Sequence, residues 1–341
     1  MTTKTWMKGW PLIAAALLFA AWTLPAMAQD EGSDEDLGEL ISEVGQIYAE
    51  GYLAPLVSGF GINQNAGLYH TAAIPLTGLK ISFGLKVMAS KLDDEDKTFR
   101  VTRRVDLSDY LDPGDPGYGD EGLLVAEGPT VFGEVGEDGN EIKGSMTAYW
   151  HGLPVYTAEG IPALVASDYV PLVAPEISLG GIAGLRATMR GVPMEFDIGE
   201  VGKLKYVGFG LAYSVNNLAP TLPVDVMVGI FSQSLDISST AEEATFSASA
   251  KSYYLGVSKA FSMLTVYGGV AKEESSMDIA YVYDNGTPNN AGDDEDIAFT
   301  LDGIQDKRTT LGATLNLGVK INAEMSMGNM TSYAGGLIFG F

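Results

Sequence analysis

The sequence contains few residues whose types and spacing could support catalysis. Its two histidines, His70 and His151, lie outside any H-E-x-x-H motif, and the chain has no cysteine, so thiol chemistry, disulfides and His- or Cys-rich metal sites are excluded. There is no G-x-S-x-G, no P-loop and no G-x-G-x-x-G after a predicted strand. His70 falls on a predicted strand, but no serine lies two residues later, where a strand-borne hydrolase would need it. We therefore expect no enzymatic activity and no cofactor, with His70 hydrogen-bonded to its neighbours and His151 a solvated loop residue.

Two acidic runs are weak candidates for calcium, which binds several carboxylate and carbonyl oxygens. Neither run matches an EF-hand loop, and a run of like charges is usually solvated. We therefore assign no metal site. The carboxylates concerned are Asp112, Asp115, Asp120 and Glu121 in the first run, and Asp293, Asp294, Glu295 and Asp296 in the second.

The elements that would position charged side chains are clearest at the end of the chain. Apolar residues alternate strictly with small or polar ones over 308–319, and the alternation returns after a turn at 318–320 and continues to Phe341. Period two indicates β-strands with one apolar face and one small or polar face. A soluble sandwich turns the apolar face inward, whereas a membrane barrel turns it toward lipid and the polar face toward the lumen.

Three further features favour the membrane barrel. Lys80 and Lys86 occupy the small-residue face of a predicted strand over 79–90, which suits a wet lumen better than a dry core. The aromatic ending, with Phe339 and Phe341, resembles the closing strand that the barrel-assembly machinery recognises. Short connections alternate with long ones, like periplasmic turns and outer loops. We predict an all-β fold, an antiparallel transmembrane β-barrel of about twelve strands (ten to fourteen) with an N-terminal amphipathic helix.

Residues 1–28 have the pattern of a secretory signal peptide. Lys4 and Lys8 precede an apolar run over 12–24, and A-M-A at 26–28 forms an A-x-A cleavage site. The apolar run is too short for a retained membrane helix. We therefore expect export to the bacterial outer membrane.

The charge of the chain restricts its partners. The net charge is −24, which becomes −26 when the two leader lysines are removed. Such a balance argues against nucleic acid and against an anionic membrane surface. The expected partners are outer-membrane lipid, lipopolysaccharide bridged through divalent cations at the rim, the barrel-assembly machinery and a small-molecule substrate of unknown identity.

The mature chain is expected to divide into an N-terminal segment and a barrel. Residues 29–51 form an acidic segment and a helix that Gly51 and Pro55 are expected to end. This helix either packs on the protein body or plugs the lumen or its periplasmic mouth. Residues 52–341 form the barrel, with one strand over 52–62 completing the twelve. Long acidic outer loops at about 91–173 and 284–307 hold 24 of the 44 acidic residues, and part of the first folds into or over the barrel mouth.

Several stretches together resemble one family. They are Y-L-A-P-L-V-S-G-F-G-I-N at 52–63 with G-L-Y-H-T-A at 67–72, T-V-F-G at 130–133, L-P-V-D-V at 222–226 and the closing residues 318–341. The family is a group of outer-membrane barrels from Bacteroidetes-type bacteria, catalogued as a domain of unknown function. The resemblance covers nearly the whole mature chain and implies the barrel and its location, but no substrate. The layout is also distantly similar to hydrophobic-compound transporters of the fatty-acid channel type, although their N-terminal plug motif is not evident.

The charged residues on the polar strand faces are the best functional candidates. They define the field and selectivity of a pore, or they fill a narrow barrel as a salt-bridge network. Three hypotheses follow: a channel or transporter for small solutes or hydrophobic compounds, a non-conducting structural or surface-interaction barrel, and an outer-membrane hydrolase that uses His70. The residues expected in the lumen are Lys80, Lys86, Glu176, Arg186, Arg190, Asp225, Lys320 and Glu324.

Overall fold

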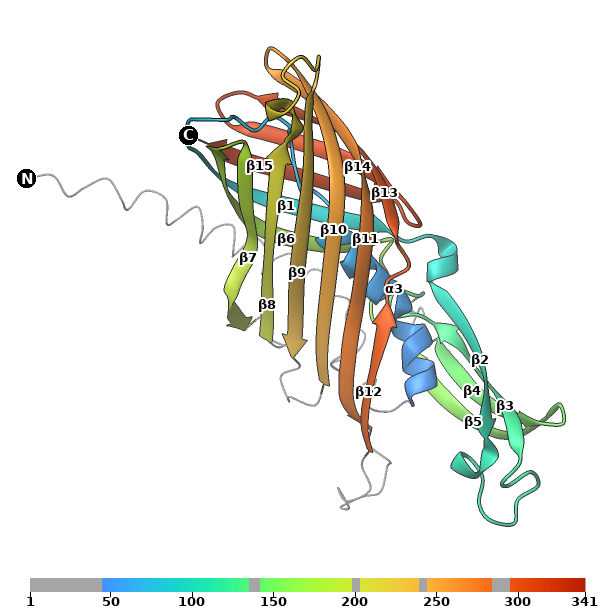
Figure 1. Cartoon of the computed structure of the whole chain (residues 1–341). Helices are drawn as coiled ribbons and strands as arrows, with labels where there is room; N and C mark the ends of the chain where they lie inside the picture. Colours follow the sequence, from blue (N-terminus) through green and yellow to red (C-terminus); the bar gives the residue numbers. More distant parts are fainter. Residues whose placement is uncertain (1–44, 135–141, 198–202, 239–243, 284–294, 341) are drawn as a thin grey trace, which may run out of the picture.

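Ten antiparallel strands close into a barrel (Figure 1). The computed structural model describes residues 45–134, 142–197, 203–238, 244–283 and 295–340. The all-β barrel with one N-terminal helix confirms the predicted fold, and ten strands lie at the lower end of the expected range. In order around the barrel the strands are β1 (Lys80–Lys91), β6 (Tyr169–Ile182), β7 (Leu185–Asp197), β8 (Lys203–Ser214), β9 (Asp225–Ser238), β10 (Ala244–Phe261), β11 (Leu264–Tyr283), β13 (Lys307–Asn316), β14 (Lys320–Met327) and β15 (Ser332–Gly340), which pairs with β1.

One side of the barrel is taller than the other. β10 and β11 have 18 and 20 residues, whereas β14 and β15 have 8 and 9. β12 (Glu295–Asp302) lies outside the ring and pairs with the C-terminal part of β11, from Ser276 to Tyr283. β13 pairs with the N-terminal part of β11, from Leu264 to Lys272. β12 and β13 therefore run along β11 as one strand that is interrupted at 303–306.

The predicted outer loop at 91–173 contains a second sheet. β2 (Thr98–Asp106), β3 (Glu121–Pro129), β4 (Lys143–Trp150) and β5 (Leu153–Pro162) pair in this order, all antiparallel. The ammonium of Lys97 lies 2.6 Å from the Asp168 carboxylate, and this hydrogen bond lowers the pKa of Asp168. The sheet packs on the start of the helix, where burial raises the pKa of the Tyr48 phenol to about 12.

The helix α3 (Gln46–Gln64) differs from the one that the sequence predicts. The predicted stop at Gly51 and Pro55 and the predicted strand over 52–62 are wrong, because the helix continues through both residues. A Cβ on Gly51 would lie 2.2 Å from the ring of Phe99, and one on Gly59 would lie 2.5 Å from Val170. These glycines allow the surrounding strands to approach the helix closely. The part of the prediction before residue 45 lies outside the described residues, and within them no helix is long and apolar enough to span a bilayer.

The hydropathy of the barrel strands inverts along their length. On β10 the outward residues Tyr253, Leu255 and Val257 are apolar and 40–45% exposed, as the lipid-facing side of a membrane barrel requires. Farther along the same face the outward residues are polar, from Lys251 to Thr245. The inward face changes in the opposite sense, because the buried residues Phe246, Ala248 and Ala250 give way to Ser252, Tyr254 and Ser258.

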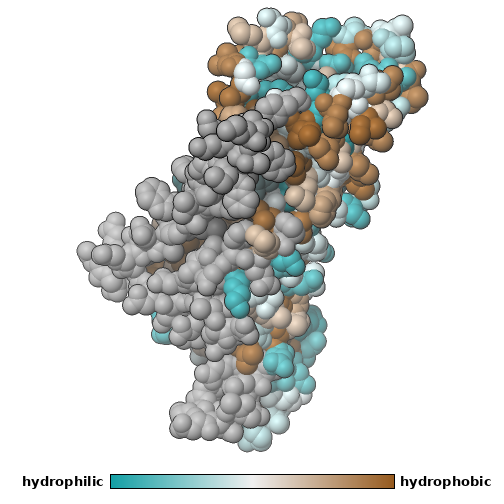
Figure 2. Space-filling view, turned by 90° about the vertical axis from the view of Figure 1, so that its left-hand side faces the viewer, coloured by the Kyte–Doolittle hydropathy of each residue, from teal (hydrophilic) through white to brown (hydrophobic). Residues whose placement is uncertain are grey.

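Each tall strand therefore belongs to two environments. The end with the short turns is a membrane barrel with a polar lumen, and the other end is a water-exposed wall around an apolar core that contains the first half of α3. Figure 2 shows the corresponding band of hydrophobic residues across the upper part of the molecule, with hydrophilic residues predominating below it.

The inversion predicts a position-dependent response to charge on a single strand. Leu255→Arg should destabilise the barrel folded in vesicles by about 2–4 kcal/mol, because it places a charge in the lipid-facing band. Thr245→Arg, ten residues away on the same face of β10, is the control and should cost less than about 1 kcal/mol. Denaturant titration of both variants in phosphatidylcholine vesicles measures the two values. Equal costs would contradict the proposed position of the bilayer.

Candidate functional site

Among the residues that the structure describes, one continuous stretch of chain fills the lumen. Residues 51–74, which we call the plug, comprise the rest of α3 and an extended segment that runs from Asn65 through the barrel to the end with the short turns. Apart from Ala54, Leu56, Thr71 and Ala73, every residue of the plug is buried. From Gly51 to Leu79 the sequence has no Asp, Glu, Lys or Arg. An uncharged segment thus lies within a wall that carries charged side chains.

Arg190 on β7 is the central contact between the wall and the plug. Its guanidinium is fully buried and donates to the carbonyl oxygens of Gln64 (3.2 Å), Ala66 (2.7 Å) and Gly67 (2.7 Å). It also donates to the carboxylate of Glu176 on the neighbouring strand, at 2.9 Å. The wall therefore neutralises the charge of this arginine, and the plug supplies only main-chain acceptors.

Arg308 on β13 makes a parallel set of contacts. Its side chain donates to the carbonyl oxygen of Ile62 at 2.6 Å and to the hydroxyl of Ser332 at 2.9 Å. The carboxylate of Glu273 on β11 lies 2.6 Å away and also accepts from Gln305 at 2.9 Å. Both residues of this ion pair are buried, with side-chain exposures of 3% and 1%.

The two arginines serve the same structural need. The last carbonyl groups of a helix have no partner within the helix and carry a partial negative charge. The C-terminal end of α3 lies inside the lumen, where bulk water cannot satisfy these groups. Arg308 and Arg190 reach it from different parts of the wall, and the amide of Gln233 on β9 also donates to the carbonyl oxygen of Gln64.

A third network holds the middle of the extended segment. The Glu324 carboxylate on β14 accepts from the main-chain N–H of Gly67 at 2.7 Å and from the hydroxyl of Tyr267 at 3.0 Å. Asn322 donates to the same tyrosine oxygen at 3.2 Å and accepts from the ammonium of Lys86 at 3.1 Å. This network joins β1, β11 and β14 to the plug through neutral and charged groups.

The plug is also fixed where it leaves the lumen. Arg186 on β7 donates to the carbonyl oxygen of Thr71 at 3.2 Å. The hydroxyl of Ser258 on β10 lies 3.3 Å from the hydroxyl of Thr71 and accepts from the N–H of Ala72 at 2.9 Å. Hydrogen bonds thus follow the plug from the end of the helix to the short turns.

The predicted lumen residues differ in how deeply they lie. Lys86 and Arg190 are fully buried, and Glu176, Arg186 and Glu324 are at most 9% exposed. Lys80, at the start of β1, is exposed, while Asp225 and Lys320 are half-buried at the starts of β9 and β14. Phe339 lies 42% exposed on β15, and Phe341 lies outside the described residues.

Neither histidine forms part of a hydrolytic arrangement in the described residues. His70 is 8% exposed within the plug, and its main-chain carbonyl accepts from the Thr314 hydroxyl at 2.8 Å. His151 lies in the β4–β5 turn at a φ of 50° and packs against the indole of Trp150. The structure also brings no three His, Cys, Asp or Glu residues together as a metal site in the part that it describes. Asp112, Asp115, Asp120 and Asp296 belong to no such group there, and Asp293 and Asp294 lie outside that part.

Sequence reasoning considered a plug only for the helix within residues 29–51, and it missed both the plug formed by residues 51–74 and the Glu273–Arg308 ion pair. The alternation places Arg308 on the polar face of its strand, so it could have been identified as a lumen residue in the same way as Lys86. Glu273 lies where the apolar and polar residues of β11 exchange faces. The alternation therefore does not show from sequence alone whether Glu273 points inward or outward. The signal for the plug was the long stretch without charge, which is unusual in so acidic a chain.

One cavity among the described residues lies beside the extended part of the plug. This cavity, lined by Asn65, Ser252 and Tyr254 among others, has a volume of about 10 Å³, which suits at most one water molecule. A solute can therefore pass along this part of the lumen only if the plug moves.

Removing one member of the buried ion pair should cost more than removing both. Arg308→Gln leaves the Glu273 carboxylate buried without a cation and should lower the free energy of unfolding by roughly 3–5 kcal/mol. The double variant Arg308→Gln/Glu273→Gln leaves no charge and should cost less. Lys307→Gln, at an exposed surface pair, is the control and should change stability by less than about 1 kcal/mol. Guanidinium titration in detergent measures all three, and a double variant as unstable as Arg308→Gln would contradict this account.

Comparison with solved structures finds other barrel proteins at low identity. A loop-deletion mutant of the outer-membrane protein OmpT of Vibrio cholerae aligns over 77% of this chain and 99% of its own, with 12% identity and a TM-score of 0.25. The outer-membrane protease OmpT of Escherichia coli aligns over 79% of this chain and 98% of its own, with 12% identity and a TM-score of 0.29.

The sequence comparisons give a family but no characterised relative. A search of curated proteins found no match. The family of unknown function DUF6588 matches residues 7–341, which confirms the resemblance to an uncharacterised barrel family. The chain therefore belongs to the DUF6588 family of unknown function.

Proposed function

We propose that this protein is a gated channel or transporter of the bacterial outer membrane, opened by movement of the plug. Its cargo would be small solutes or hydrophobic compounds. The lipid-facing band of the barrel and the predicted signal peptide support the location. The observation that carries the proposal is the way in which the plug is held: the main contacts from charged wall residues go to its main-chain groups, and none of its own side chains is an acid, lysine or arginine.

This arrangement allows the wall to remain intact when the plug leaves. Arg190 keeps Glu176 and Arg308 keeps Glu273, so no buried arginine in these two pairs would lose its counter-ion. Breaking a buried ion pair costs roughly 3–5 kcal/mol, whereas a hydrogen bond to a charged group contributes only about 1.5–3 kcal/mol. The vacated space would be lined by polar and charged side chains and would admit water.

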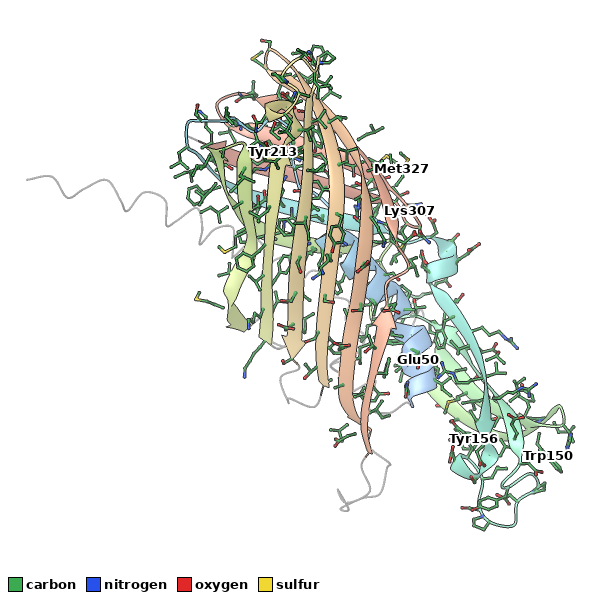
Figure 3. The ribbon with its side chains drawn as sticks, in the orientation of Figure 1. Glu50, Trp150, Tyr156, Tyr213, Lys307 and Met327 are labelled. Atoms are coloured by element: carbon green, nitrogen blue, oxygen red, sulfur yellow. The ribbon has the colours of Figure 1, made fainter. Side chains whose placement is uncertain are left out.

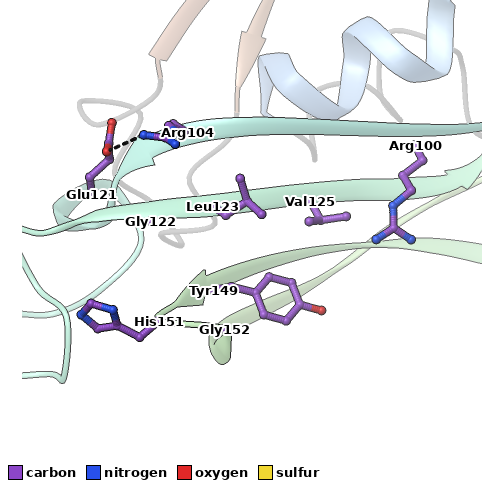
Figure 4. Close-up of a pocket in the computed structure, with 9 residues that line it drawn as sticks. All are labelled: Arg100, Arg104, Glu121, Gly122, Leu123, Val125, Tyr149, His151 and Gly152. Atoms are coloured by element: carbon purple, nitrogen blue, oxygen red, sulfur yellow. Dashed lines mark hydrogen bonds and ion pairs between the residues drawn. The ribbon is translucent and has the colours of Figure 1, made fainter.

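A non-conducting barrel that binds a partner at its surface is the second candidate. The face of the second sheet turned away from α3 has a depression of about 430 Å³. Figure 4 shows Leu123, Val125 and Tyr149 along its floor, with Arg104 paired to Glu121 at its edge. The Arg103–Glu50 ion pair joins the opposite face of β2 to α3. The second sheet is therefore held beside the end of the barrel that lies opposite the short turns (Figure 3).

A disulfide between plug and wall tests the gate, because the chain has no cysteine of its own. Thr71→Cys/Ser258→Cys joins the plug to β10 at side chains whose oxygens are 3.3 Å apart, within the range of a disulfide after small adjustment. We expect the oxidised protein to show only background conductance in planar bilayers and the reduced protein to show channels. Ser178→Cys/Thr188→Cys, which joins two wall strands at 3.1 Å, is the matched control and should conduct in both states.

The outcomes separate the two candidates. Equal channel activity of the oxidised and reduced plug variant would exclude a moving plug. Silence of every form, with the folded barrel verified by its heat-dependent mobility in the same sample, would favour the non-conducting surface barrel.

A further inference from the structure

Three cations at the end with the short turns lack the ion pairs found elsewhere in the lumen. Arg190 and Arg308 each have a carboxylate within 3 Å. Lys80, Arg186 and Lys320, which we call the mouth cluster, have none within 4.0 Å among the described residues. This concentration of positive charge occurs in a chain with a net charge of −24.

One member of the mouth cluster, Arg186, is buried, so its lack of a counter-ion is physically significant. Arg186 is 9% exposed, and its guanidinium donates to the Thr71 carbonyl and to the sulfur of Met227, a weak acceptor. Buried charges in proteins are normally paired, because their desolvation is costly.

The strand register brings the cluster together and places glycines beside its members. Arg186 on β7 is aligned with Gly180 on β6, and Gly180 with Lys80 on β1. A Cβ on Gly180 would meet no neighbour closer than 3.6 Å, and one on Gly340 would lie 4.0 Å from the ammonium of Lys320. Because both positions are glycine, no side chain from either one lies between the cations.

The nearby carboxylates are engaged elsewhere or lie at the edge. Glu176 pairs with Arg190, and Glu324 accepts from Gly67 and Tyr267. Asp225, half-buried at the start of β9, forms no ion pair within the described residues.

We infer that the mouth cluster binds a small oxyanion, a carboxylate or phosphate group, between Lys80, Lys320 and Arg186. The exposed Lys80 and half-buried Lys320 receive the anion, and its charge compensates the buried Arg186. Guanidinium and ammonium groups are the usual partners of such anions. If the anion is part of the cargo, this inference rests on the proposed channel function. Binding of the anion itself does not require the protein to conduct.

Inorganic phosphate is the probe, added to the full-length refolded protein in non-ionic detergent at constant ionic strength. We expect phosphate, relative to chloride, to raise the midpoint of thermal unfolding by about 2–4 °C through preferential binding to the folded state. Lys80→Gln/Lys320→Gln should lose most of this shift. Lys91→Gln/Lys307→Gln is the matched control: it makes the same charge change at two exposed lysines at the other end of the barrel and should retain the shift.

The variants distinguish specific binding from general salt stabilisation. An equal phosphate shift in Lys80→Gln/Lys320→Gln and in the parent would overturn the site, as would no difference between phosphate and chloride in the parent. If only vesicles containing phosphatidylglycerol stabilise the parent and free phosphate does not, the cluster binds a lipid headgroup and the solute site is excluded. A phosphate-induced rise in the unfolding midpoint without conductance in bilayers would support the anion site and contradict the proposed channel function.

Discussion

The carbonyl groups at the C-terminal end of α3 impose the main constraint on this structure. A helix that ends in a lumen without bulk water has unsatisfied acceptors and a partial negative charge at that end. Arg190 and Arg308 satisfy them, and each then needs a carboxylate because a buried guanidinium is costly alone. The position of the helix thus accounts for two wall ion pairs on four different strands.

The inversion of hydropathy explains how a buried helix can coexist with a membrane barrel. The first half of α3 is surrounded by apolar residues from the tall strands and from the second sheet, as in a soluble protein. Its C-terminal end enters the polar part, where hydrogen bonds replace apolar contacts. The same strands supply both environments because alternate residues face opposite sides, and the residue types on the two faces exchange near residue 252 of β10.

Much of the barrel could be predicted from sequence because period-two alternation is a local signal. The pairing of β14 with β13 and β15 follows directly from the alternation over 308–341. The path of 52–74 could not be predicted in this way, because glycine and proline usually end helices. Contact with Phe99, some fifty residues later in the chain, explains why Gly51 lies within one. The inward position of Lys86 could be predicted from the alternation of its strand. Its contact with Asn322 could not, because that contact depends on the register of β1, β15 and β14.

The strength of the plug contacts indicates what could open the lumen. Each hydrogen bond between a guanidinium and a plug carbonyl contributes about 1.5–3 kcal/mol, and several act together. A total protein stability of about 5–15 kcal/mol is of similar size, so spontaneous release of the plug would be rare. Release requires other acceptors for the same donors, either water that enters the vacated space or a bound solute. A solute with carboxylate or phosphate oxygens, received by Lys80 and Lys320, offers such acceptors to Arg186, the arginine that holds Thr71 beside the short turns. Binding of the cargo and loosening of the plug would then be one exchange of hydrogen bonds.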